Sequence, residues 1–118
     1  MNPEELERRL IDFAVKIISM TESIKRSYAG VHLSKQIIRS GTSPALNYGE
    51  ARGAESRKDF VHKIKIVLKE LRETYISLKI LNKSNLIKNG SFQIDVIAKE
   101  CNELISIFVA TTKTIGTL

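Results

Sequence analysis

Six lysine and arginine side chains recur at helical spacing between residues 58 and 83. We call them the basic row: Lys58, Lys65, Lys69, Arg72, Lys79 and Lys83. With His62 and Ile76 they follow one another at steps of four and three, which places all eight positions along one side of a single helix. At 1.5 Å of rise per residue the basic row extends about 37 Å. A line of positive charges such as this suits a phosphate backbone, because each neutralised phosphate releases counterions and adds affinity that does not depend on base sequence.

Two other interpretations of the basic row stay open, since a solvated lysine face and a helix that lines an interface give the same pattern. No aromatic residues are interleaved with the cations, so base stacking has little support. The distribution of charge favours an anionic partner. The net charge is +6, and residues 23–69 carry ten basic residues against three acidic ones, whereas the rest of the chain is close to neutral.

A second pattern of chemistry-bearing residues precedes the basic row, again at steps of four and three. We call it the polar row: Gln36, Ser40, Ser43, Asn47 and Glu50. Short polar groups beside an apolar stripe either form hydrogen bonds between helices, which fixes the register of the bundle, or belong to a binding or assembly surface. The residues by themselves leave both alternatives open.

The residue types required for catalysis are few. His32 lies near an expected helix start, His62 lies on the side of the basic row, and Cys101 occupies a position expected in the core, so no nucleophile and base are paired. The sequence Asp59-x-x-His62 is the only approximation to a metal-binding pair, and it is expected to face away from the core. There is no glycine-rich phosphate loop. We therefore expect no enzyme activity, no catalytic residues, no metal and no cofactor.

Length and composition are those of one globular domain covering residues 1–118. No stretch approaches the roughly 18 uninterrupted apolar residues of a membrane span, so no membrane partner is expected. The first residues are acidic where a secretory signal would be basic and then apolar, and Cys101 has no partner for an internal disulfide. Both observations favour a cytoplasmic location.

Apolar residues at steps of four and three predict an all-α fold, an antiparallel up-and-down four-helix bundle. The first helix is expected over about residues 3–27, with Asn2 as its cap and Pro3 in its first position. The second is expected over about residues 31–52, with a kink near Pro44, which lacks a backbone donor and crowds the preceding turn. Ser56-x-x-Asp59 predicts the start of the third helix, and Asn89-Gly90-Ser91 predicts a turn and a cap before the fourth.

One stretch of the second and third helices resembles a known family. Gln36-x-x-Arg39-Ser40, followed by Ser43, Asn47 and Glu50, is joined at the family's spacing to Ser56-x-Lys58-Asp59-Phe60. This combination resembles the bacterial four-helix bundle family of 23S rRNA intervening sequence proteins, and most of the chain fits it. In the commoner family pattern, a glycine follows the glutamate that corresponds to Glu50. This sequence departs from that pattern, because Ala51 follows Glu50.

The resemblance implies a homo-oligomer, a pentameric ring or barrel, and a kinship with the accessory proteins of diversity-generating retroelements. Those proteins bind nucleic acid and a reverse transcriptase, so RNA, DNA and a reverse transcriptase or other protein are the partners it implies. It implies no catalytic residues. Assembly also leads us to expect apolar side chains outside the core stripes, at Ile11, Ile18, Ile66, Ile76, Ile105 and Val109.

Two functions remain. The first is a homo-oligomeric module that binds nucleic acid, RNA more readily than DNA, through the basic row and without sequence specificity. The second is an assembly or adaptor protein with no nucleic-acid role.

Overall fold

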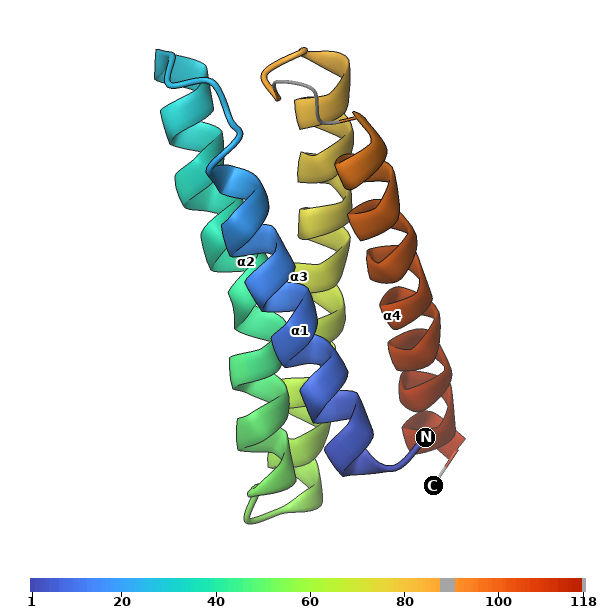
Figure 1. The fold of residues 1–118 in the computed structure, drawn as a ribbon. Helices are drawn as coiled ribbons and strands as arrows, with labels where there is room; N and C mark the ends of the chain where they lie inside the picture. Colours follow the sequence, from blue (N-terminus) through green and yellow to red (C-terminus); the bar gives the residue numbers. More distant parts are fainter. Residues whose placement is uncertain (88–90, 118) are drawn as a thin grey trace.

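The computed structural model describes residues 1–87 and 91–117, without the side chains of residues 91, 92 and 117. Its four helices are α1 (Pro3–Thr21), α2 (Tyr28–Arg52), α3 (Arg57–Lys83) and α4 (Ser91–Thr117). They run alternately up and down in a body 46 × 21 × 21 Å in extent, with both chain ends at the same end of it (Figure 1). The predicted all-α four-helix bundle is confirmed.

Helix α1 is shorter than the sequence predicts. Asn2 caps it as expected, because its side-chain oxygen accepts a hydrogen bond from Glu5 N at 2.8 Å. The helix ends at Thr21 and not near residue 27. Ile24 is still buried, as its apolar spacing predicted, but it lies in an isolated bridge with Ile87 outside any helix. The periodicity therefore identified the core residue and misplaced the helix end.

Helix α2 begins three residues earlier than predicted, with Ser27 as its cap. The Ser27 hydroxyl accepts a hydrogen bond from Gly30 N at 3.1 Å. A Cβ atom at Gly30 would lie 1.7 Å from the carbonyl oxygen of Lys25, so only glycine fits this entry into the helix. The helix is continuous through Pro44, which is buried. The kink at Pro44 stays a prediction.

The start of α3 agrees with the prediction, since the Ser56 hydroxyl accepts a hydrogen bond from Asp59 N at 3.0 Å. After the end of α3, Asn85 has a φ of 57°, the left-handed conformation common after helix ends. The predicted turn at Asn89-Gly90 lies outside the described residues. Helix α4 is described from Ser91, the residue predicted as its cap.

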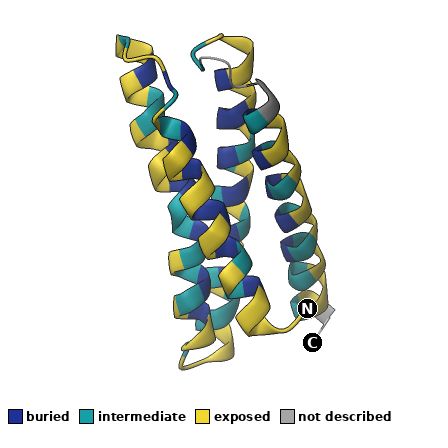
Figure 2. Ribbon diagram, viewed as in Figure 1, coloured by how far each residue is buried: buried dark blue, intermediate teal, exposed yellow. Residues whose placement is uncertain are grey.

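The core runs the length of the bundle, and all four helices contribute fully buried side chains to it (Figure 2). Tyr48 of α2 contacts Phe108 of α4 edge to face, with ring centroids 5.7 Å apart. Of the four pairs of neighbouring helices, α2 and α3 share the most extensive contact, and α1 and α4 the least. An ion pair joins α1 and α4, because Arg9 of α1 donates two hydrogen bonds of 2.7 Å to Glu100 of α4.

Candidate nucleic-acid interface

Helix α3 carries the basic row on its outer side. All six of its cations are exposed, as are His62 and Ile76 between them. Ile64, Leu71 and Leu78, on the opposite side of the same helix, are fully buried. The amphipathic geometry that the spacing predicted is therefore confirmed, and the basic row lies free on the surface of the bundle.

Two acidic residues of α3 are paired with an arginine of α2. Glu70 and Glu73 both accept hydrogen bonds from Arg39 of α2, the first over 2.9 Å. Lys63, which is not a member of the basic row, lies 3.6 Å from Glu50 of α2. Among the described residues, no carboxylate lies within 4.0 Å of any cation of the basic row. The row is thus an unneutralised positive track, whereas the charges between α2 and α3 are paired.

One aromatic residue lies beside the basic row, which the sequence interpretation did not recognise. The Lys79 ammonium lies 4.7 Å from the centre of the Tyr75 ring. Tyr75 is half-buried and packs against the core, and the ammonium covers its ring. This contact orients a lysine of the row over a ring that is already partly buried.

Two members of the polar row, Ser40 and Glu50, and their neighbour Arg39 contact side chains of α3. Ser40 is fully buried and accepts a hydrogen bond of 2.9 Å from the Thr74 hydroxyl of α3. Asn47 bonds within α2, donating to the carbonyl and hydroxyl oxygens of Ser43 at 3.0 and 2.9 Å. Gln36 is exposed. These contacts favour the interpretation that the row fixes the register of two helices.

Potential catalytic side chains do not come together in the described structure. Cys101 is fully buried, its thiol donates to the Leu71 carbonyl at 3.3 Å, and burial raises its pKa to about 12. His32 and His62 are exposed on different helices. Over residues 1–87 and 91–117, no three His, Cys, Asp or Glu side chains are grouped as a metal ion would require.

The structure also groups a second set of cations that the sequence analysis did not single out. A surface depression of about 460 Å³ at the start of α2 is lined by the cations Arg26 and Lys35 together with His32 and with Tyr28, which is 93% exposed. The sequence analysis noted only the charge excess over residues 23–69. Tyr28, His32 and Lys35 follow one another at steps of four and three, but the second helix was predicted to begin only near residue 31, so the set was not recognised.

Residues 5–110 match the family model described as 23S rRNA-intervening sequence protein. The chain belongs to this family. The family motif from Gln36 to Glu50 falls within the matched range, and in this member its residues Arg39, Ser40 and Glu50 contact side chains of α3.

A solved structure agrees with the family assignment. It is a protein with unknown function from the S23 ribosomal protein family of Bacteroides thetaiotaomicron VPI-5482. It is 32% identical to this chain, covers 96% of this chain and 99% of its own length, and superposes with a TM-score of 0.85. No curated protein matches this member of the 23S rRNA-intervening sequence family. Within the described ranges, none of its helices is long and apolar enough to cross a membrane.

Proposed function

We propose that this chain is a non-enzymatic, homo-oligomeric helical bundle of the cytoplasm that binds nucleic acid through the basic row without sequence specificity. The observation that carries the proposal is the exposure of six cations on one side of α3, with no described carboxylate within 4.0 Å of them. Unpaired cations at this spacing can each neutralise a phosphate without first breaking an ion pair.

RNA is the better candidate than DNA. The family description names 23S rRNA, and the description of the solved relative names a ribosomal protein family. Double-stranded RNA is recognised mostly by its shape, its phosphates and its 2′-hydroxyl groups, and not by reading its bases in the major groove. A row of flexible cations that includes no aromatic residue fits that mode of binding.

Self-association would use a different side of the bundle. Six large aliphatic side chains are exposed on α1 and α2, and soluble monomers rarely expose extended apolar patches. They are Ile11, Val15, Ile18, Val31, Ile38 and Leu46. Of the apolar residues expected outside the core stripes, Ile11, Ile18 and Ile76 are exposed, whereas Ile66, Ile105 and Val109 are half-buried. A ring of copies joined through α1 and α2, a pentamer by family resemblance, would leave the basic row accessible.

The same apolar residues favour the second candidate function, an adaptor that docks another protein and binds no nucleic acid. A reverse transcriptase is one such partner by family resemblance. The two candidates make opposite predictions for binding of a structured RNA, so one experiment separates them.

The test is fluorescence anisotropy of a labelled structured RNA over a series of salt concentrations. Duplex binding weakens with a log–log slope of about −0.9 per neutralised phosphate, so six contacts predict about −5 per bound protomer. Reversal of the three central charges, K65E, K69E and R72E together, should weaken binding and reduce the slope to about −3. A matched control reverses three exposed cations away from the row, R8E, K16E and K99E, with the same change of net charge.

The control should retain the wild-type slope. Equal losses in the two triple variants would mean that only net charge matters, and would contradict the assignment of binding to α3. Absence of binding at low salt, from a protein that light scattering shows to be oligomeric, would favour the adaptor function.

A further inference from the structure

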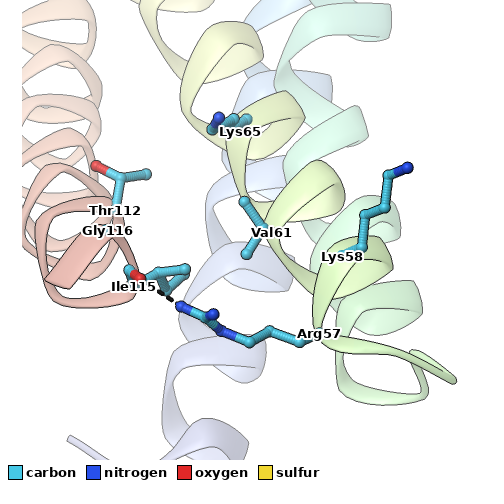
Figure 3. A pocket seen from close by; sticks show the side chains of 7 residues that line it. All are labelled: Arg57, Lys58, Val61, Lys65, Thr112, Ile115 and Gly116. Carbon is cyan, nitrogen blue, oxygen red and sulfur yellow. Dashed lines mark hydrogen bonds between the residues drawn. The ribbon is translucent and has the colours of Figure 1, made fainter. Parts of the chain in front are cut away.

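A groove of about 550 Å³ separates the first turns of α3 from the last turns of α4 (Figure 3). Arg57, Lys58, Val61 and Lys65 line it from α3, and Thr112, Ile115 and Gly116 line it from α4. Its volume falls within the range of about 300–1,000 Å³ that is common for small-ligand sites. Two of its cations, Lys58 and Lys65, also belong to the basic row.

The walls of the groove combine positive charge with apolar surface. Three of the seven lining residues are cations and none is acidic. Val61 and Ile115 are half-buried, and they offer a partly desolvated apolar surface between the two helices. The complementary ligand is therefore an anion attached to a body with an apolar face.

The Arg57 guanidinium is positioned to bind such an anion. It extends across the groove and donates one hydrogen bond of 2.6 Å to the Ile115 carbonyl, whereas the Lys58 side chain points away from α4 (Figure 3). A guanidinium has five N–H donors in a planar fork, so a phosphate can still be bound by the remaining ones. The contact with Ile115 fixes where the fork lies.

The position of the groove relative to the basic row indicates which phosphate it takes. The row ends at Lys58, the second residue of α3, so a nucleic-acid strand that follows the row from Lys83 reaches its last cations at the groove. A phosphodiester carries one negative charge, whereas a terminal phosphomonoester carries nearly two at neutral pH. A cluster of cations beside an apolar wall favours the more highly charged group.

We propose that the groove between α3 and α4 is a binding site for a nucleotide phosphomonoester, with the phosphate on Arg57 and Lys65 and the sugar and base against Val61 and Ile115. The phosphomonoester belongs either to the end of a nucleic-acid strand or to a free mononucleotide. The first source rests on the proposed function, because the strand is held by the basic row. The second does not.

Competition anisotropy tests the proposal and separates the sources. A labelled RNA is displaced by unlabelled strands of one sequence that carry a 5′-phosphate, a 3′-phosphate or neither. A strand with a terminal phosphate should compete about tenfold better than the strand without one. Adenosine 5′-monophosphate is titrated separately, with binding followed by the NMR signals of the Val61 and Ile115 methyl groups.

The decisive variant is V61F, which fills the groove and keeps every cation. It should abolish the preference for a terminal phosphate while leaving the salt slope of the unphosphorylated strand unchanged. R57Q, which retains a donor for the Ile115 carbonyl, is a second variant and should reduce the preference as well. The matched control, K79A with K83A at the far end of the row, should weaken all three strands equally.

The outcomes are distinct. If all strands compete equally and the monophosphate shifts neither methyl signal, the groove proposal is wrong and the proposed function stands. If the labelled RNA itself does not bind, but the monophosphate binds and V61F prevents it, the proposed function fails and the groove binds free nucleotide. A preference for a terminal phosphate that persists in correctly folded V61F and R57Q overturns the groove proposal, because Arg57 then only caps α4.

Discussion

A methyl group added to Gly41 of α2 would collide with the side chain of Ile17 on α1. The Cβ atom would lie 2.8 Å from Ile17 Cγ2 and 2.9 Å from Cγ1. These distances are about 0.6 Å shorter than an ordinary contact between carbon atoms. Ile17 is fully buried, so it cannot move aside without disturbing the core.

The magnitude for G41A combines two opposing terms. Alanine is favoured over glycine inside a helix by about 1 kcal/mol, whereas overpacking a core costs about 1–3 kcal/mol. The expected result is a net destabilisation of up to about 2 kcal/mol. For a domain of this size, that lowers the melting temperature by roughly 3–6 °C per kcal/mol.

Gly49 provides the matched control, because it lies on the same helix and G49A is the same chemical change. A Cβ atom there would meet only the Glu7 carboxylate oxygen, at an ordinary 3.7 Å. Without a collision, the helix-propensity term remains, and G49A should stabilise the protein by about 0.5–1 kcal/mol. The two variants should therefore shift stability in opposite directions.

The assay is urea unfolding followed by circular dichroism at one fixed protein concentration, since self-association makes apparent stability depend on concentration. A double-mutant cycle with I17A identifies the cause, because that substitution removes both Cγ atoms. I17A should cost about 2–5 kcal/mol in the wild type and clearly less in the G41A background. Equal stabilisation by G41A and G49A would refute the reasoning.

Two further predictions concern ionisable groups. The Arg9 side chain, through its hydrogen bonds, lowers the pKa of Glu100 below its ordinary 4.5. The pair therefore stabilises the protein above about pH 4.5, and this contribution is lost as the pH falls through the lower folded-state value. R9A should lower the free energy of unfolding by about 1–2 kcal/mol at pH 7 and by progressively less below pH 4.5. Urea titrations at several pH values measure this. R8A, which changes an exposed arginine, should show no such dependence on pH. Because burial raises the pKa of Cys101 to about 12, its thiol should react with a maleimide at pH 8 only as fast as the protein unfolds, and faster reaction would place it at the surface.

The sequence predicted those parts of the fold that depend on near neighbours in the chain. The spacing of apolar residues identified four helices and the fully buried positions Ile64, Leu71 and Leu78. The Asn2 and Ser56 caps were predicted because a cap bonds a backbone group three residues away. The exposure of the basic row followed from the same period of 3.6 residues.

The errors have a different physical origin. Helix α1 was predicted too long because Ile24 continues its apolar period, yet Ile24 is buried by a bridge to Ile87, 63 positions later in the chain. The sequence analysis assigned no role to Gly41, which the structure places against the side chain of Ile17 on α1. Neither feature has a local signature, since each depends on a partner that is distant in sequence.

The sequence by itself determined the fold class, the side of α3 that carries the cations, and the family motif on α2. Only the tertiary structure decided which charges remain unpaired. Arg39 of α2 is paired with two glutamates of α3, and Lys63 of α3 is paired with Glu50 of α2. No carboxylate among the described residues lies within 4.0 Å of the basic row. Likewise, only bundle closure brings Arg57 to the Ile115 carbonyl, 58 positions away, and so creates the groove. Helical periodicity is a local property of the chain, whereas ion pairing and cavities depend on which helix faces meet.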